Sequence, residues 1–122
     1  MSHPNYFYQR LEQELQQVCT KISALVQSKP LYASLWSQLQ HHAAEVWPEL
    51  LQHWQTPDLI EPKQRLEQIL AALSQYEIGG YGLCADCEAE IPIAELLQDP
   101  AQQRCQECNK EHKANLHQPP HK

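Results

Sequence analysis

Apolar residues recur every three or four positions along residues 5–27, with glutamine and glutamate between them. This spacing places the apolar side chains on one face, so it predicts an amphipathic helix over this range. Ser28 and Pro30 then break the pattern, and because serine caps helices and proline fits a first turn, a second helix is expected from about residue 30. The stripe of the first helix consists of Phe7, Leu11, Leu15, Val18, Ile22 and Leu25.

A second apolar stripe runs from residue 30 to residue 54 and keeps its phase past Pro48. An interior proline costs a helix about 3 kcal/mol, but the unbroken phase favours one kinked helix over two helices joined by a loop. Each of the two helices would be about 33–37 Å long, and the short turn between them predicts an antiparallel pair. The stripe includes Trp36, Trp47 and Trp54, which we expect to pack in the core or against another chain.

Pro57 and Pro62 bracket a segment that we expect to be a bent connector. A third helix is predicted from Pro62 to about Glu77, and the glycine pair at 79–80 should end it, since glycine adopts positive φ without steric cost. The predicted fold is therefore mainly α, a helical hairpin plus a third helix that leads into a small four-cysteine zinc finger. The expected divisions are an N-terminal helical hairpin (1–60), a connecting helix (61–80), the finger (81–112) and a polar tail (113–122) that is frayed or disordered.

Four of the five cysteines form two Cys-x-x-Cys pairs, Cys84 with Cys87 and Cys105 with Cys108, separated by seventeen residues. Each pair can place two thiolates on one side of a tight turn, and two such turns can close a tetrahedron around one Zn²⁺ ion. The spacing therefore predicts a structural zinc site, with two disulfides or four unconnected thiols as the alternatives. Cys19 lies within a helical pattern among apolar residues and is expected to be a small buried hydrophobe.

The chain has 122 residues and a net charge of −6, enough for one domain or one and a half with a modest core. It has neither an apolar run long enough to span a membrane nor the opening pattern of a signal peptide, so we expect a cytoplasmic protein. From residue 84 to residue 111 there are seven acidic residues but only Arg104 and Lys110 as bases. A nucleic-acid-binding finger needs the opposite balance, so a protein partner with a basic surface is favoured over DNA or RNA.

Other chemistry finds little support in the residue pattern. His41 and His42 are adjacent, and on a helix they would point about 100° apart, which disfavours a shared metal ion. His112 follows Cys108 by four residues and is an alternative fourth ligand. A thiol–disulfide enzyme would need basic residues beside its cysteines, whereas acids surround these. The chain also has no recognisable nucleophile–base pair, so we expect that it is not an enzyme.

The finger carries further landmarks around its cysteines. Tyr81-Gly82 precedes the first pair, Ile91-Pro92 follows it, and Pro100 precedes the second pair. With the helical approach from residue 66 to residue 73, these features resemble the DksA/TraR-type zinc-finger family over about residues 64–112. The resemblance implies a protein that binds RNA polymerase directly, inserts a helical hairpin into its secondary channel and does not contact DNA. It also implies that zinc is structural, and that some members respond to the alarmone ppGpp.

The chain departs from that family in two places. Members usually carry an Asp-x-x-Asp-x-Ala tip that acts near the catalytic magnesium of polymerase, and the nearest match here is Asp58 with Glu61, in a predicted turn. Glu95 stands where the family commonly has an arginine. The leading hypothesis is a transcription accessory protein that contacts RNA polymerase. The alternative is a zinc-stabilised protein–protein interaction module, possibly a homodimer, without a polymerase role.

Overall fold

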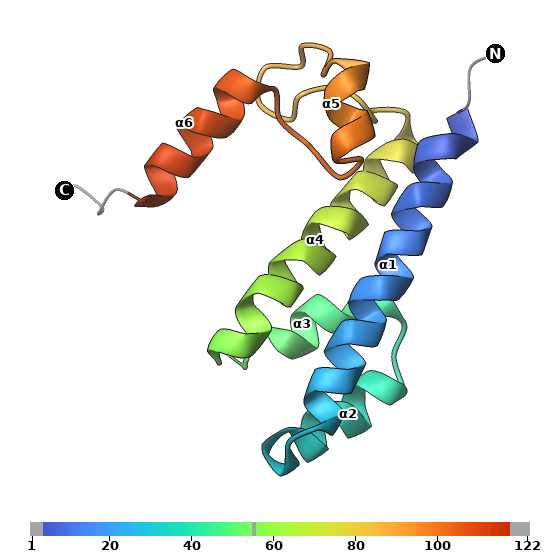
Figure 1. Cartoon of the computed structure of the whole chain (residues 1–122), viewed down its shortest axis with the longest axis vertical. Coiled ribbons are helices and arrows are strands. Elements are labelled where there is room, and N and C mark those ends of the chain that lie inside the picture. Colours follow the sequence, from blue (N-terminus) through green and yellow to red (C-terminus); the bar gives the residue numbers. More distant parts are fainter. Residues whose placement is uncertain (1–3, 55, 118–122) are drawn as a thin grey trace.

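Two long helices, α1 (Pro4–Gln27) and α4 (Pro57–Ile78), run antiparallel along the molecule (Figure 1). The computed structural model describes residues 4–54 and 56–117, and the side chains of residues 6–54 and 56–111. α1 packs more extensively against α4 than against any other element. Leu11 and Ile22 are fully buried, and Leu15, Val18 and Leu25 pack at the edges of the core. The amphipathic first helix is therefore confirmed.

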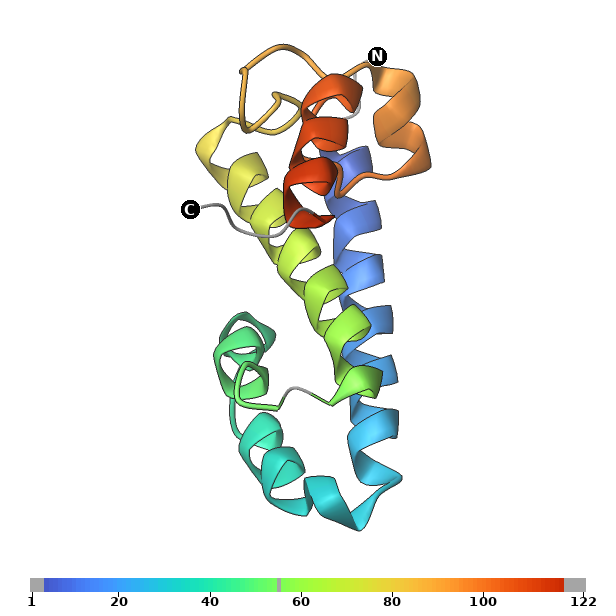
Figure 2. The ribbon, with the colours of Figure 1, turned by 90° about the vertical axis from the view of Figure 1, so that its left-hand side faces the viewer.

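The second helix is not the single kinked rod that the sequence predicts. Residues 30–51 form two short helices, each preceded by a 3₁₀ turn, and they fold back beside the far half of the α1–α4 pair (Figure 2). The antiparallel partner that α1 was expected to find in residues 30–54 is instead α4. The four elements are η1 (Pro30–Tyr32), α2 (Ala33–Gln40), η2 (Ala44–Val46) and α3 (Trp47–Leu51).

The break between α2 and α3 has a physical cause. Pro48 lies in the first turn of α3, where its missing N–H costs nothing, whereas inside a continuous helix it would cost about 3 kcal/mol. The carbonyls at the end of α2 find other partners: the rings of His41 and His42 bond the carbonyls of residues 37 and 38, at 3.1 and 2.7 Å. The indole N–H of Trp47 donates to the carbonyls of Leu39 and His42. These bonds satisfy groups that a helix end leaves unpaired.

The predicted connector at residues 56–62 is also helical. Thr56 takes the extended conformation of a cap, and Pro57 occupies the first position of α4. Pro62 lies inside α4, where it forfeits one backbone hydrogen bond near the start of the helix. Its ring is buried on the same face as Leu59 and Leu66, so packing offsets that loss. The third helix therefore begins five residues earlier than predicted.

One core cluster joins all four helices. It contains residues from both sides of the predicted domain boundary at residue 60, for example Leu51 and Leu66. Trp47 is buried, and Trp36 and Trp54 pack against the cluster at its edge, so the packing role predicted for the tryptophans is confirmed. Cys19 is half-buried against the same cluster, and burial raises the pKa of its thiol. We refer to helices α1 to α4 as the body.

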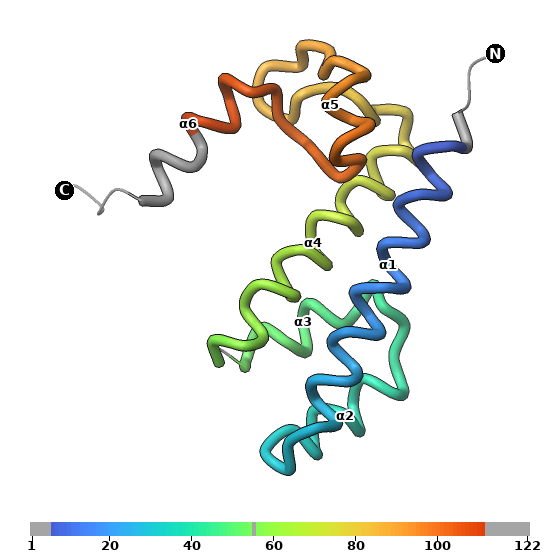
Figure 3. Tube along the Cα trace, viewed as in Figure 1, coloured from blue at the N-terminus to red at the C-terminus, as the bar shows by residue number. Residues whose placement is uncertain are grey.

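The chain leaves the body through a glycine turn and enters the finger, residues 81–111. Gly79 has φ of 87°, and Gly80 donates its N–H to the carbonyl of Gln75 at 2.8 Å, which ends α4 as predicted. The finger contains α5 (Ile93–Gln98) and the start of α6 (Gln106–His117), and it sits at one end of the body (Figure 3).

The mainly α fold, with a helix leading into a four-cysteine finger, is confirmed. Within the described residues, β structure is limited to one isolated bridge. α6 continues to His117, past the predicted start of the polar tail at 113, and residues 118–122 lie outside the described part. No helix among the described residues combines the length and hydrophobicity needed to cross a membrane.

Candidate metal centre

The first cysteine pair lies in a tight backbone turn. The N–H of Cys84 donates to the carbonyl of Ala89 and that of Ile91 to the carbonyl of Gly82, both at 2.8 Å. These bonds flank the bridge between residues 83 and 90. The turn closes at Glu88, whose φ of 65° is in the left-handed region that few residues other than glycine adopt. The result is a short loop that presents Cys84 and Cys87 on one side.

The second cysteine pair lies where α6 begins. Cys105 immediately precedes the helix and accepts a backbone hydrogen bond from Asn109 at 2.8 Å, while Cys108 lies in the first turn. Exposed N–H groups at a helix start favour negative charge, so this position suits thiolates. The N–H of Ala85 donates to the carbonyl of Gln103 at 2.7 Å and thereby joins the two halves of the finger. An ion pair from Arg104 to Asp86 at 2.9 Å holds them together as well.

The four sulfur atoms of Cys84, Cys87, Cys105 and Cys108 all lie within 4.8 Å of one another. The Sγ atoms of Cys87 and Cys105 are 3.8 Å apart. That is the edge of a tetrahedron whose corners lie about 2.3 Å from its centre, the usual zinc–sulfur distance, and far longer than the bond of about 2.05 Å in a disulfide. All four cysteines are free. The residues therefore fit one tetrahedral metal ion, and they have no disulfide in this arrangement.

The electrostatics of the cluster also favour a cation. Burial raises the pKa of Cys84, but N–H groups of Cys87, Cys105 and Asp86 point at its sulfur and outweigh burial, lowering the pKa to about 6. The N–H of Asp86 lies 3.4 Å from that sulfur. Contacts with the Cys105, Cys84 and Cys87 thiols raise the pKa of Cys108 well above its usual range. One thiol ionises readily while its neighbour resists further negative charge, and a bound cation would relieve that repulsion.

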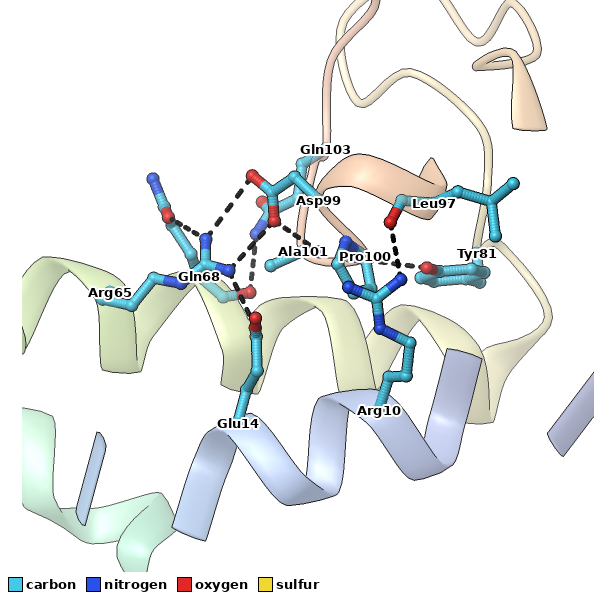
Figure 4. A network of polar contacts seen from close by, with 10 residues as sticks. All are labelled: Arg10, Glu14, Arg65, Gln68, Tyr81, Leu97, Asp99, Pro100, Ala101 and Gln103. Carbon is cyan, nitrogen blue, oxygen red and sulfur yellow. Dashed lines mark hydrogen bonds and ion pairs between the residues drawn. The ribbon is translucent and has the colours of Figure 1, made fainter. Parts of the chain in front are cut away.

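A polar network fastens the finger to the body (Figure 4). Arg65 on α4 reaches Glu14 on α1 at 2.8 Å and Asp99 of the finger at 3.0 Å. Burial alone would lower the pKa of Arg65, but Asp99 and Glu14 outweigh it and raise the pKa. Asp99 also accepts the N–H of Ala101 at 3.0 Å, which fixes the loop before the second cysteine pair. Nearby, the side chain of Gln103 donates to the backbone of α4 at 2.9 Å.

Replacing Asp99 with alanine is expected to lower the free energy of unfolding by about 1 kcal/mol, because charged hydrogen bonds are lost but both groups remain partly exposed to solvent. Glu67→Ala is a matched control, since among the described residues Glu67 pairs with Lys63 one turn earlier on the same helix and not with the finger. The control should change stability by about 0.5 kcal/mol or less. Urea denaturation of the zinc-loaded proteins measures the free energy of unfolding of both variants. Equal losses in the two variants would contradict a role for Asp99 in fastening the finger to the body.

Aromatic rings form the second contact between finger and body. The hydroxyl of Tyr81 donates to the carbonyl of Pro100 at 2.7 Å, and its ring lies 5.4 Å from Tyr76 and 5.7 Å from Phe7. Burial is the main cause that raises the pKa of Tyr81 well above its usual range. Arg10 on α1 donates to the carbonyl of Leu97 at 2.6 Å. The Tyr81 landmark of the sequence therefore has a packing role at the base of the finger.

Sequence reasoning did not find the network around Arg65. Its members are 34 and 51 positions apart along the chain, and no local periodicity links them. Glu95, which stands where the resembled family commonly has arginine, accepts a hydrogen bond from Gln102 at 2.6 Å within the finger. It also lies in the first turn of α5, where an acid is favourable. The alternative ligand His112 has its side chain outside the described residues.

The possible acidic tip lies at the start of α4, at the end of the body away from the finger. Asp58 pairs with Lys29 at 2.7 Å and accepts the hydroxyl of Tyr32 at 2.8 Å. Tyr32 also contacts the hydroxyl of Thr56 at 2.6 Å. These contacts tie η1 to the first turn of α4. Glu61 is exposed and forms no ion pair among the described residues. The role of Asp58 and Glu61 at a polymerase stays a prediction.

Acid should weaken the body through Asp58. Hydrogen bonds from Lys29 and Tyr32 lower the pKa of its carboxyl from 3.8 to about 2, so the folded state gains stability from Asp58 above pH 4 and loses it as the pH falls from about 4 towards 2. We expect Asp58→Asn to melt at a lower temperature than the unmodified protein at pH 7, with the gap closing below pH 4. Glu61→Gln is the control. A gap that stays constant with pH would contradict the assignment.

Comparisons with known proteins support the fold. No protein-family model and no curated protein sequence matches the chain. Among solved structures, it is similar to the transcription factor DksA2 from Pseudomonas aeruginosa, with a TM-score of 0.57 and 20% sequence identity. The match covers 94% of this chain and 86% of that one. In this chain a finger with four clustered cysteines sits at one end of a long antiparallel helix pair. The chain therefore has a DksA-like fold.

Proposed function

We propose that this protein is a transcription accessory factor of the DksA/TraR type, which contacts RNA polymerase in the cytoplasm and does not bind DNA. The observation that carries the proposal is the shared fold with the transcription factor DksA2 across 94% of the chain. The finger landmarks Tyr81-Gly82 and Ile91-Pro92, through which the sequence resembles the DksA/TraR-type family, also support the proposal. Both Tyr81 and the buried Ile91 lie at the base of the finger, beside the body.

In this proposal the four cysteines hold one Zn²⁺ ion with a structural role. The four thiolates would complete its tetrahedral coordination and leave no open position for a substrate or a reactive water. The ion's contribution would be to fix the two halves of the finger against each other. The protein's action would then reside in surfaces of the body and the finger, and not in chemistry at the metal.

The charge of the finger supports a protein partner over a nucleic acid. Asp86 and Asp99 are paired with arginines, but Glu88, Glu90 and Glu107 form no ion pair among the described residues. Four thiolates around one Zn²⁺ would add about −2 to the local charge. A surface of this sign repels phosphates, since affinity for DNA comes from lysine and arginine that replace its counterions.

Direct binding to polymerase tests the proposal. The tagged, zinc-loaded protein should retain core RNA polymerase in a pull-down, and a known secondary-channel factor should compete for that binding. A DNA duplex at low salt should show no complex in an electrophoretic mobility assay. If no polymerase binds at micromolar concentration, the proposal is wrong. Comparing Glu61→Gln with Asp58→Asn in the same assay would show whether the acidic pair contributes, with the melting temperature as a check on folding.

The second candidate function is a zinc-stabilised interaction module with no polymerase role. The observation that favours it is at the far end of the body, where Asp58 is already engaged by Lys29 and Tyr32 and so offers little free charge to a polymerase. Such a module could act as a homodimer through its exposed apolar side chains. Sedimentation at high concentration distinguishes a homodimeric module from a monomeric one, because a strictly monomeric species excludes the dimer.

A further inference from the structure

An open apolar groove is lined by residues from the beginning of α1, the end of α4, the loops of the finger and α5. These segments lie together at one end of the molecule (Figures 1 and 2). Its volume is about 1090 Å³. Four large apolar side chains line it and remain exposed to solvent: Tyr6 at 43%, Leu83 at 43%, Ile93 at 60% and Leu97 at 47%. Apolar side chains gathered in one hollow are unusual on a free surface and mark interaction sites.

Two of the polar groups beside the groove are already engaged, whereas the buried hydroxyl of Tyr76 has no hydrogen-bond partner among the described residues. The hydroxyl of Tyr81 donates to Pro100, and the guanidinium of Arg10 donates to the carbonyl of Leu97 while lying over the ring of Tyr6. Pockets for small polar molecules present several converging polar groups to orient the ligand. Among the described residues that line this groove, the one charged side chain is Glu90. An apolar face of a larger partner therefore fits the groove better than a small polar molecule does.

The charge of the residues around the groove favours one class of partner protein. Glu90 forms no ion pair within the described part of the chain, and the finger that forms one wall has seven acidic residues against two basic ones between 84 and 111. A symmetric pairing of two copies through this groove would bring two acidic fingers together. Like charges that face each other across an interface disfavour association. Basic residues beside an apolar stripe would instead find complementary charge.

We propose that this groove is the docking site for a helix of a partner protein that carries an aliphatic stripe flanked by lysine or arginine. The aliphatic side chains would cover Ile93, Leu97 and Tyr6, and the basic residues would face Glu90. Helices that dock in grooves commonly use anchors spaced three and four residues apart. This inference does not depend on polymerase as the partner, so the pull-down described above can fail without affecting it.

A synthetic helical peptide tests the groove. The probe is a fluorescent peptide of about 18 residues with leucines at i, i+3, i+4 and i+7 and lysines beside them. Its control has glutamate in place of each lysine. In fluorescence anisotropy with the zinc-loaded full chain, the lysine peptide should bind at micromolar concentration and the glutamate peptide about tenfold more weakly or worse. Equal binding of the two peptides would overturn the proposed charge preference.

Two matched variants locate the binding. Ile93→Glu adds a carboxylate in the groove, and Ile60→Glu adds one on a comparably exposed apolar residue at the other end of α4. Electrostatics alone predicts that both bind the lysine peptide at least as tightly as the unmodified protein. Loss of apolar contact predicts that Ile93→Glu binds about tenfold more weakly while Ile60→Glu does not. Ile93→Ser repeats the test without added charge, and circular dichroism confirms folding.

Two results would overturn the proposal. One is equal affinity of the peptide for the Ile93 and Ile60 variants, which would mean that the peptide binds elsewhere on the acidic surface. The other is self-association of the unmodified protein in sedimentation that Ile93→Glu abolishes, which would assign the groove to a second copy of this chain.

Discussion

Removal of the metal is expected to unfold the finger and to leave most of the body helical. Zinc bound to structural cysteine sites contributes about 10–16 kcal/mol in isolated finger peptides, and a segment held together in this way does not fold without the ion. The finger has a small buried core beside its few polar contacts: of its described residues, Cys84, Ile91, Leu96, Pro100 and Ala101 are buried. We therefore expect chelation to release residues 81–111.

The body has a core of its own that does not depend on the finger. The larger apolar cluster draws all its members from helices α1 to α4 and the segments that connect them, and none from the finger. The smaller cluster near the finger includes Ala101 and Tyr81, so the adjoining ends of α1 and α4 should loosen when the finger unfolds. The loss of helical signal should be small, because α5 and α6 hold six and twelve residues against 24 and 22 in α1 and α4.

Far-ultraviolet circular dichroism before and after a chelator measures this effect, and amide hydrogen exchange shows which residues lose protection. Cys84→Ser should reproduce the chelated state, since it removes one ligand. Cys19→Ala is the control, because Cys19 lies in the body and should leave the metal bound. Complete loss of helicity would mean that the chain is one cooperative unit. No change in either measurement would mean that the site is not structural.

The features that sequence reasoning placed correctly depend on short-range rules. Two Cys-x-x-Cys pairs define a cluster because each pair closes its own turn, and the structure brings all four sulfurs together. The glycine pair ended α4 where expected because positive φ at Gly79 is a local requirement. The apolar stripe of α1 predicted the helix correctly because one face of that helix meets the core along its length.

The errors arose where one residue type has two possible contexts. The sequence predicts Pro48 inside a kinked helix and Pro62 at the start of a helix. The structure has the reverse: Pro48 starts a new helix, and Pro62 lies within a continuous one. The local sequence does not separate these cases, because the outcome depends on what supplies the missing hydrogen bonds. Trp47 and His42 satisfy the carbonyls at the break, and burial offsets the loss at Pro62. These contacts appear only when the chain is folded.

Replacement of Leu66 by alanine is expected to destabilise the body strongly. Leu66 is fully buried in the cluster that joins the four helices. Truncation of a buried leucine to alanine costs about 2–5 kcal/mol, because apolar contacts are lost and a cavity remains. Leu31→Ala is the control, since Leu31 is largely exposed and should lose about 0.5 kcal/mol or less. Urea denaturation of the zinc-loaded proteins measures the difference.

The same experiment tests whether residues 1–60 and 61–80 are separate units. All three tryptophans lie between residues 36 and 54, so their fluorescence reports unfolding of the α2–α3 region, whereas circular dichroism reports all helices. Leu66 is on α4, but it shares a core with Leu39 and Leu51 from α2 and α3. A cooperative body therefore requires that both signals shift together to lower urea in Leu66→Ala. A tryptophan transition that does not move would mean that the N-terminal helices fold independently of α4, as the sequence-based division at residue 60 implies.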